Sequence, residues 1–149
     1  MSDPKLTIQR LSKAQKKDIQ RFYKLNNYPA SFIGYDHTYI LAIEQKIIGA
    51  VIISYQSENN HYALLHGLLI APGYRNEGYA NLLIKKVMSE HNHIVCFAER
   101  DLEALYISNG FNEEISNKLP NYLIKRYESY VKKSKALAIF ISNKDTSNR

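Results

Sequence analysis

The chain has 149 residues, of which 45% are hydrophobic and 23% are charged, and its formal net charge is +6. This is the composition of a soluble globular domain, and no apolar run approaches the ~20 residues that a membrane-spanning helix needs. The single cysteine excludes an internal disulfide bond and a cysteine-based zinc site. Because the N-terminal stretch MSDPKLTIQR lacks the apolar core of a signal peptide, we expect a cytoplasmic protein.

The positive charge is concentrated at the two ends of the chain. The net charge is +5 over residues 1–26, −5 over 27–117 and +6 over 118–149. Such ends could meet an acidic partner or keep the protein soluble. No basic stretch is interleaved with stacking aromatic residues, so we favour solubility and do not expect a nucleic-acid partner.

In chain order, the first half predicts strands around one helix. KLTIQRL (5–11) alternates as a strand, and the capping box of Ser12 and Gln15 opens a helix that ends near Asn26. A loop follows over 26–37. Residues 38–44 and 47–55 predict an antiparallel hairpin, 57–60 a turn, and 62–70 a third long strand.

The second half predicts helices between shorter strands. We expect a helix over 78–90, a strand over 94–98, a short helix between Asp101 and Gly110, and a strand over 111–116. An amphipathic helix over 119–133, a strand over 136–142 and a disordered tail over 143–149 complete a single domain, residues 1–142. Strand, helix and strand between 62 and 98 indicate a parallel pair within a mixed, otherwise antiparallel sheet of an α+β or α/β protein.

A bend between the third strand and the next helix has the composition of an anion site. The stretch LIAPGYRNEGYANLLIKKVM (69–88) passes from an apolar strand through Pro72, Arg75, Gly78 and Ala80 into a helix. A helix that begins here presents unpaired N–H groups and the positive end of its dipole. Gly78 and Ala80 leave room for a ligand, so the bend predicts a phosphate or pyrophosphate site.

Two motifs give a resemblance to a known family. Arg75, Gly78 and Ala80 form R-x-x-G-x-A, and LYISNGF (105–111) supplies Leu105, Tyr106, Gly110 and Phe111 of L-Y-x-x-x-G-F. Together with the hairpin segment GAVIIS, they resemble the GNAT superfamily of N-acetyltransferases over roughly residues 5–116. The resemblance implies an α/β/α sandwich, a mostly antiparallel sheet with a parallel pair at the acyl-CoA site, acetyl-CoA as cosubstrate and no metal.

The resemblance also implies where coenzyme A lies. The pantetheine arm would pair with the end of the strand 62–70, where that strand and its neighbour 94–98 splay apart, and the pyrophosphate would lie on the amides of the bend. The expected coenzyme-binding residues are Leu68, Leu69, Ile70, Arg75, Asn76, Glu77, Gly78, Tyr79 and Ala80.

Tyr106 is the expected general acid, because the family uses a tyrosine here to protonate the departing thiolate; alternatively it is a core aromatic residue. His66 is a candidate base on a face shared with Leu64, Leu68 and Ile70 if the strand is regular, or else a hydrogen-bonded strand histidine.

Tyr28, Tyr35, Asp36 and Glu99 are candidate contacts to the acceptor amine, although a structural loop (28–37) and a solvated acid at a helix start are open alternatives. Cys96, in a short apolar strand, fits packing better than a nucleophilic role. His91 and His93 flank a helix end and fit a position facing the helix dipole or solvent better than metal binding. The helix 119–133 could be extra core, a cover over the acceptor site or the surface of a homodimer.

The expected activity is acetyl transfer from acetyl-CoA to a primary amine of a small molecule or peptide, by direct attack. The alternatives are a non-catalytic acyl-CoA-sensing module and a binder of RNA or acidic protein through the basic ends.

Overall fold

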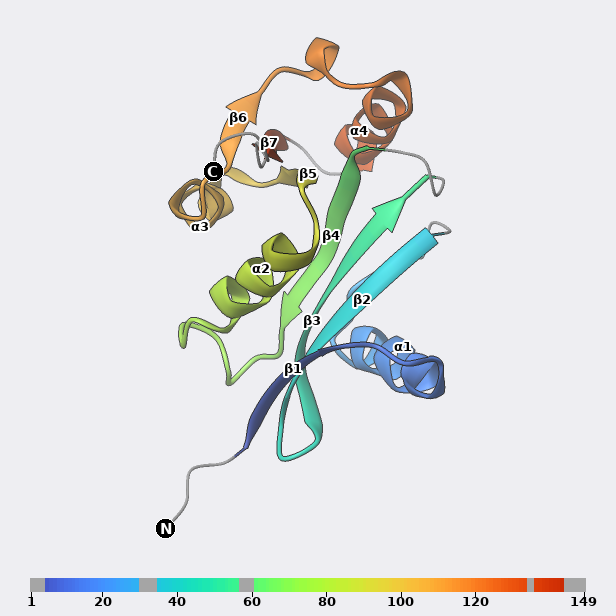
Figure 1. Cartoon of the computed structure of the whole chain (residues 1–149), viewed down its shortest axis with the longest axis vertical. Helices are drawn as coiled ribbons and strands as arrows, with labels where there is room; N and C mark the ends of the chain where they lie inside the picture. Colours follow the sequence, from blue (N-terminus) through green and yellow to red (C-terminus); the bar gives the residue numbers. More distant parts are fainter. Residues whose placement is uncertain (1–4, 30–34, 57–60, 134–135, 144–149) are drawn as a thin grey trace.

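The computed structural model describes residues 5–29, 35–56, 61–133 and 136–143 (Figure 1). Within these ranges seven strands form one sheet in the order β1-β2-β3-β4-β5-β7-β6. The strands are β1 (Leu6–Arg10), β2 (Tyr35–Ile43), β3 (Lys46–Tyr55), β4 (Ala63–Ile70), β5 (His93–Ala98), β6 (Asn112–Glu114) and β7 (Ala138–Asn143). Among the described strands β4 and β5 pair in parallel and every other pair is antiparallel, which confirms the predicted mixed sheet.

Four α-helices cover the two faces of this sheet in the described ranges. They are α1 (Lys16–Leu25), α2 (Tyr79–Glu90), α3 (Glu103–Ser108) and α4 (Asn121–Lys133), and short 3-10 turns cover Lys13–Gln15, Arg100–Leu102 and Ser116–Lys118. The predicted capping interaction is present: the Ser12 N–H donates to Oε1 of Gln15 at 3.0 Å, and the 3-10 turn that follows leads into α1.

The helices lie in two layers, which confirms the α/β/α sandwich (Figure 1). Leu83, Ile84 and Val87 of α2 and Tyr106 of α3 pack on one face of the sheet. On the other face, α1 contributes Ile19, Phe22 and Tyr23. The α4 region covers the same face farther along, where Leu119 and Leu123 pack against β4, β5 and β7.

The start of β2 differs from the prediction. The loop expected over 26–37 ends earlier, because Tyr35 pairs with Tyr55 and His37 with Ile53 in the β2–β3 ladder. The expected turn 57–60 lies outside the described residues. So does the expected tail, apart from Asn143, which ends β7.

A β-bulge at Gly67 interrupts β4. The register runs from Ile52↔His66 to Ala50↔Leu69, so one residue of β3 faces two residues of β4, and Gly67 has φ +65°. The bulge reverses which face the later side chains occupy. Leu64 packs in the α4 cluster, whereas Leu68 and Ile70 pack in the α2 cluster. The expectation that His66 shares a face with Leu68 and Ile70 is therefore wrong.

Beyond the bulge, β4 and β5 separate. Their pairing extends from Ala63↔Ile94 to Leu65↔Cys96, whereas β5 continues to Ala98 with β7 alone as its partner. The Gly67 carbonyl group instead accepts a hydrogen bond of 2.6 Å from the Tyr23 hydroxyl of α1. The end of β4 therefore leaves an opening in the middle of the sheet, on the C-terminal side of the parallel pair.

Candidate active site

The N-terminus of α2 lies beside this opening. Gly78 is its N-cap residue, with φ +83° in the left-handed region that glycine tolerates best. In the part of the chain that the structure describes, no side chain caps the helix, and its first turn holds no acidic residue. A Cβ atom at Gly78 would meet nothing within 4 Å, so the space in front is open. The helix end therefore offers free amide donors and a positive dipole to an anion.

A cavity of about 590 Å³ lies in front of this helix end. The expected coenzyme-binding residues all line it except Glu77. The sequence prediction missed five further lining residues, Tyr74, Asn81, Asp101, Leu102 and Leu105. Nε of Arg75 donates to the Ile70 carbonyl oxygen at 2.8 Å, so the guanidinium group is held against the end of β4.

A second cavity of about 360 Å³ adjoins the first. Leu68 and Leu102 line both cavities, which therefore meet at the separated strands. The polar side chains in its wall are Tyr28, His66, Glu99, Tyr106 and Tyr130. The expected general acid and the expected general base thus line one cavity together with two of the expected acceptor contacts, Tyr28 and Glu99.

Tyr106 belongs both to the core and to this cavity. Its side chain is 2% exposed and stacks on Phe140 with a centroid separation of 5.8 Å. Burial raises the pKa of its hydroxyl well above the ordinary value, and the neighbouring Cys96 thiol raises it further. The hydroxyl group is therefore protonated at neutral pH. Burial also raises the pKa of Cys96 far above its ordinary range, so this thiol is not an activated nucleophile.

His66 is linked to Asp36 through Ser54. Nε2 of His66 lies 2.7 Å from the Ser54 hydroxyl oxygen, and that hydroxyl donates to Oδ1 of Asp36. A serine hydroxyl has one proton to donate, so His66 is the donor in its bond to Ser54 and carries its proton on Nε2. Burial lowers the pKa of His66 to about 4, with Asp36 acting in the opposite direction. The imidazole is thus neutral at pH 7 and keeps the lone pair of Nδ1.

The residues expected to contact the acceptor amine do not all lie in the same place. Tyr28 and Glu99 line the cavity with His66, whereas Asp36 lies behind His66 and is not among the residues that line this cavity. The Tyr35 side chain lies outside the described part of the structure. Sequence reasoning missed Ser54, whose role depends on the register between β3 and β4, and Tyr130, which α4 brings over the cavity.

Two absences concern the described residues. No group of three His, Cys, Asp or Glu side chains that could hold a metal ion occurs among them. No helix formed by these residues is long and apolar enough to span a membrane.

Comparison with known proteins identifies the family to which this geometry corresponds. A family model described as an acetyltransferase (GNAT) domain matches residues 34–113, more than half of the chain. No curated protein matches the chain by sequence.

Solved structures share the fold at low sequence identity. An N-acetylglutamate synthase from Neisseria gonorrhoeae, complexed with coenzyme A and N-acetyl-glutamate, has a TM-score of 0.67 and 12% identity, over 95% of this chain and 35% of the synthase. A GNAT-family acetyltransferase from Staphylococcus aureus Mu50 has a TM-score of 0.64 and 15% identity, over 95% and 100% of the two chains.

A spermidine N-acetyltransferase from Vibrio cholerae, complexed with CoA and spermine, has a TM-score of 0.54 and 17% identity, over 74% and 82% of the two chains. The chain spans only about a third of the synthase. At these identities the likeness extends to the fold and not to the substrate.

Proposed function

The chain belongs to the GNAT family of N-acetyltransferases, which use acetyl-CoA, and we propose that it moves the acetyl group of acetyl-CoA to a primary amine by direct attack. The observation that carries this proposal is the pair of adjoining cavities at the separated strands. One cavity ends at the uncapped helix N-terminus, and the other contains Tyr106 and His66. Acetyl-CoA in the first cavity and an amine in the second would meet where the two cavities adjoin.

The first cavity suits coenzyme A. The open amides of α2 would hold the pyrophosphate, because a helix N-terminus favours negative charge. Leu68, Leu69 and Ile70 at the end of β4, which lacks β5 as a partner there, would align the pantetheine arm. Acetyl-CoA supplies an acetyl group activated as a thioester. Two of the similar structures contain coenzyme A, which agrees with this assignment.

Tyr106 is proposed as the general acid. Its raised pKa keeps the proton on the hydroxyl group at neutral pH. A thiol has an ordinary pKa of ~8.5, below that of this phenol, so Tyr106 would act mainly by donating a hydrogen bond to the departing thiolate and sharing its proton in the transition state. A buried, protonated tyrosine also spares the site a fixed negative charge beside the thiolate.

His66 is proposed as the general base. The neutral imidazole can take a proton from the acceptor amine at Nδ1, directly or through water. The positive charge that this creates would be stabilised through Ser54 by Asp36, either as a polarised chain or by passing the Nε2 proton along it. A base with a pKa near 4 is weak even with Asp36 nearby, so the proposal requires the proton to leave the amine nitrogen as it attacks the thioester rather than before.

The setting of the reaction follows from the same proposal. The single cysteine and the use of acetyl-CoA suit a reducing cytoplasm, which is our proposed location. A similar spermidine acetyltransferase is dodecameric, and a homodimer of this chain remains a prediction.

The direct test is thiol release from acetyl-CoA in the presence of a panel of primary amines and peptides, with mass spectrometry of the amines. We expect at least one amine to be acetylated with release of an equal amount of coenzyme A. If coenzyme A bound tightly and no amine in the panel were acetylated, the result would favour an acyl-CoA-sensing module. Failure to bind coenzyme A would contradict both readings.

A further inference from the structure

A third cavity lies under α4, next to the proposed base. It has a volume of about 360 Å³ and includes Ser54, Leu64, Tyr122 and Arg126 in its wall. Ser54 is also the hydrogen-bond partner of His66, which lines the cavity with Tyr106. The Ser54–His66 pair therefore joins the walls of the two spaces.

The helix that covers this cavity is firmly placed. Leu123 is buried against Leu64 and Val95 of the sheet. The Tyr122 hydroxyl donates to the Tyr62 carbonyl oxygen at 3.2 Å, and the Tyr127 hydroxyl donates to the Leu137 carbonyl oxygen at 2.8 Å. The polar side chains of α4 that face the cavity are consequently held by a helix with fixed position, as a binding site requires.

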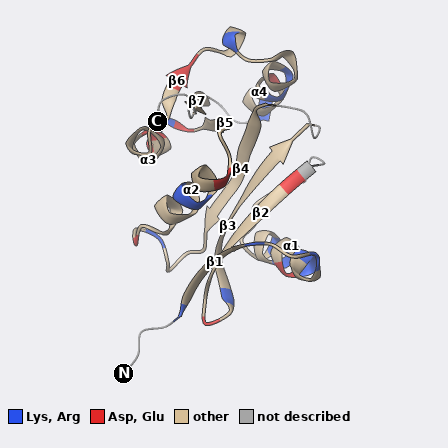
Figure 2. Cartoon of the chain, in the orientation of Figure 1, with Lys and Arg blue, Asp and Glu red and all other residues tan. Residues whose placement is uncertain are grey.

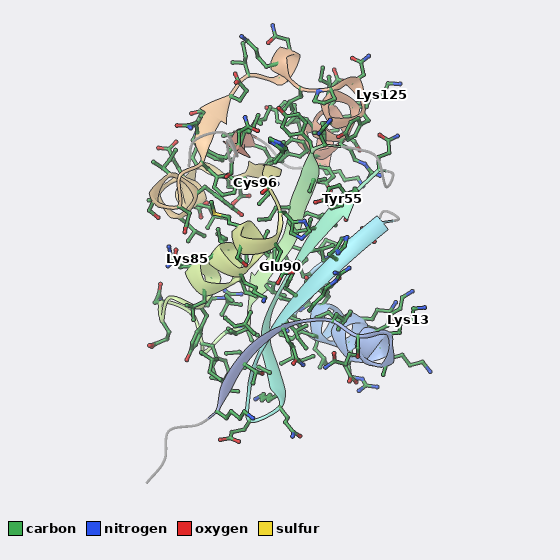
Figure 3. All side chains as sticks on the ribbon, in the orientation of Figure 1. Lys13, Tyr55, Lys85, Glu90, Cys96 and Lys125 are labelled. Atoms are coloured by element: carbon green, nitrogen blue, oxygen red, sulfur yellow. The ribbon has the colours of Figure 1, made fainter. Side chains whose placement is uncertain are left out.

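The wall that α4 contributes is positively charged. Lys125 and Arg126 both line the cavity. Figure 2 marks basic positions of α4 in blue at the upper end of the sheet, and Figure 3 labels Lys125 there. No carboxylate among the described residues lies within ion-pair distance of Arg126. Its charge is close enough to lower the pKa of His66 and of Tyr130. A guanidinium group with this placement is suited to bind a carboxylate.

Negative charge lies in the cavity that contains the proposed base. Glu99 lines that cavity but not the cavity under α4. An acidic side chain, Glu99, thus lies at the end of the site proposed for the amine, and basic side chains, Lys125 and Arg126, lie under α4. A ligand with an ammonium group at one end and a carboxylate at the other has the complementary charges.

We propose that the acceptor is an amine that also carries a carboxylate, bound by Arg126 with its amine toward His66. This inference rests on the proposed acetyl transfer. Lys125 adds to the positive field, whereas Arg126 supplies the planar pair of donors that a carboxylate accepts. Cationic acceptors such as polyamines would be repelled at the same position.

The test compares amines that differ only at the far end. The substrates are ω-amino carboxylates of increasing length, from glycine upward, each with the alkylamine and the diamine of the same length. We expect kcat/KM for the best carboxylate to exceed that of its alkylamine by ~10-fold or more, and the diamine to be the poorest. Amide capping of the carboxylate should remove the advantage.

Variants of α4 assign the effect to a residue. Arg126→Gln should abolish the preference for the carboxylate, chiefly by raising KM for the ω-amino carboxylate. Arg126→Glu should reverse the preference toward the diamine. Lys132→Gln removes a positive charge from an exposed position of the same helix that does not line the cavity, and it should leave the preference unchanged. Arg126 is exposed, so these variants are expected to fold.

The negative outcomes of this test distinguish a wrong acceptor from a wrong reaction. If alkylamines or diamines reacted as well as carboxylates, or if Arg126→Gln kept the preference, the inference about the acceptor would be overturned and the acetyl transfer would stand. If no amine reacted while coenzyme A still bound, the proposed transfer would fall, and the acceptor assignment with it.

Discussion

Tyr106 combines a structural and a proposed chemical role, and a conservative substitution separates them. Tyr106→Phe keeps the ring that stacks on Phe140 and removes the hydroxyl group next to Cys96. We expect kcat to fall ~100-fold, the scale of a lost general acid, with little change in melting temperature. Steady-state kinetics with an active amine and a thermal melt measure the two effects. Unchanged turnover would show that Tyr106 has only a structural role in the core.

Ser54 is the residue on which the proposed base depends. Ser54→Ala breaks the link between His66 and Asp36 and leaves Nε2 of His66 without this partner. We expect kcat to fall by ~10-fold, less than the loss of the base itself, and KM for acetyl-CoA to stay constant. The Ser54→Thr variant keeps the hydroxyl group and should retain most of the activity. Equal activity of the Ala and Thr variants would exclude the chain of hydrogen bonds from catalysis.

At the scale of an element, the bulge in β4 creates the opening between β4 and β5. Gly67 has φ +65°, and a Cβ atom there would lie 3.0 Å from the Tyr23 hydroxyl oxygen and 3.1 Å from Cδ1 of Ile52. Gly67→Ala combines backbone strain with overpacking and should lower the free energy of unfolding by about 2 kcal/mol or more. The matched control is Gly110→Ala.

Gly110 also has positive φ, at +90°, but a Cβ atom there would meet nothing within 4 Å. Only backbone strain then applies, and the cost should be about 1 kcal/mol. Urea denaturation of both variants measures the difference. Equal losses would show that the contacts around Gly67 do not constrain the bulge.

Most elements of this fold could be predicted from the sequence, because the apolar residues recur at strand or helix spacing. The bend before α2 could be predicted too, since an apolar strand, glycine and a helix start lie close together in the chain. The position of the bulge could not, because β4 is apolar on both faces apart from His66, so the side-chain period gives no register.

The parts of the candidate site that were missed depend on contacts between distant elements. Nothing in the sequence around Ser54 distinguishes it from other strand serines. Its proposed role depends on the register of β3 and β4, which places it opposite Leu64 and next to His66. Arg126 was part of a predicted amphipathic helix, but its sequence does not say which face of the sheet that helix covers. Tertiary placement, rather than residue type, gives both residues their proposed roles.

At the scale of the whole molecule, a buried polar cluster makes stability depend on pH. His91 has both ring nitrogens bound to tyrosine hydroxyls, Nε2 to Tyr39 at 2.8 Å and Nδ1 to Tyr55 at 2.6 Å. Tyr39 in turn donates to the Glu90 carboxylate. The hydroxyl proton of Tyr39 is thereby used, so His91 donates from Nε2. Figure 3 labels Glu90, at the end of α2, and Tyr55, at the end of β3.

Burial lowers the pKa of His91 to about 4, and the nearby charges of His37 and Arg10 lower it further against the opposing effect of Glu90. The unfolded chain would take up this proton near pH 6.5, so stability is fully present above that pH and declines as the pH falls toward 4. The slope is at most about 1.4 kcal/mol per pH unit for each such histidine. His66 contributes in the same direction.

Chemical denaturation between pH 7 and pH 4.5 should therefore show a falling free energy of unfolding, on the order of 1 kcal/mol per pH unit. His91→Gln can keep one donor and one acceptor for the tyrosines and does not titrate, so it should reduce this slope. An identical slope in the variant would contradict the assignment to His91.

The central claim, that the N-terminus of α2 binds coenzyme A, is tested most directly by calorimetric titration of coenzyme A into the native chain, Gly78→Asp and Gly78→Asn. Asp and Asn are similar in size and both tolerate positive φ, so the pair isolates a negative charge placed at the helix end. We predict that the native chain binds, that Asn weakens binding modestly, and that Asp weakens it by a further ~10-fold or more. Equal affinities of the Asp and Asn variants would contradict the account.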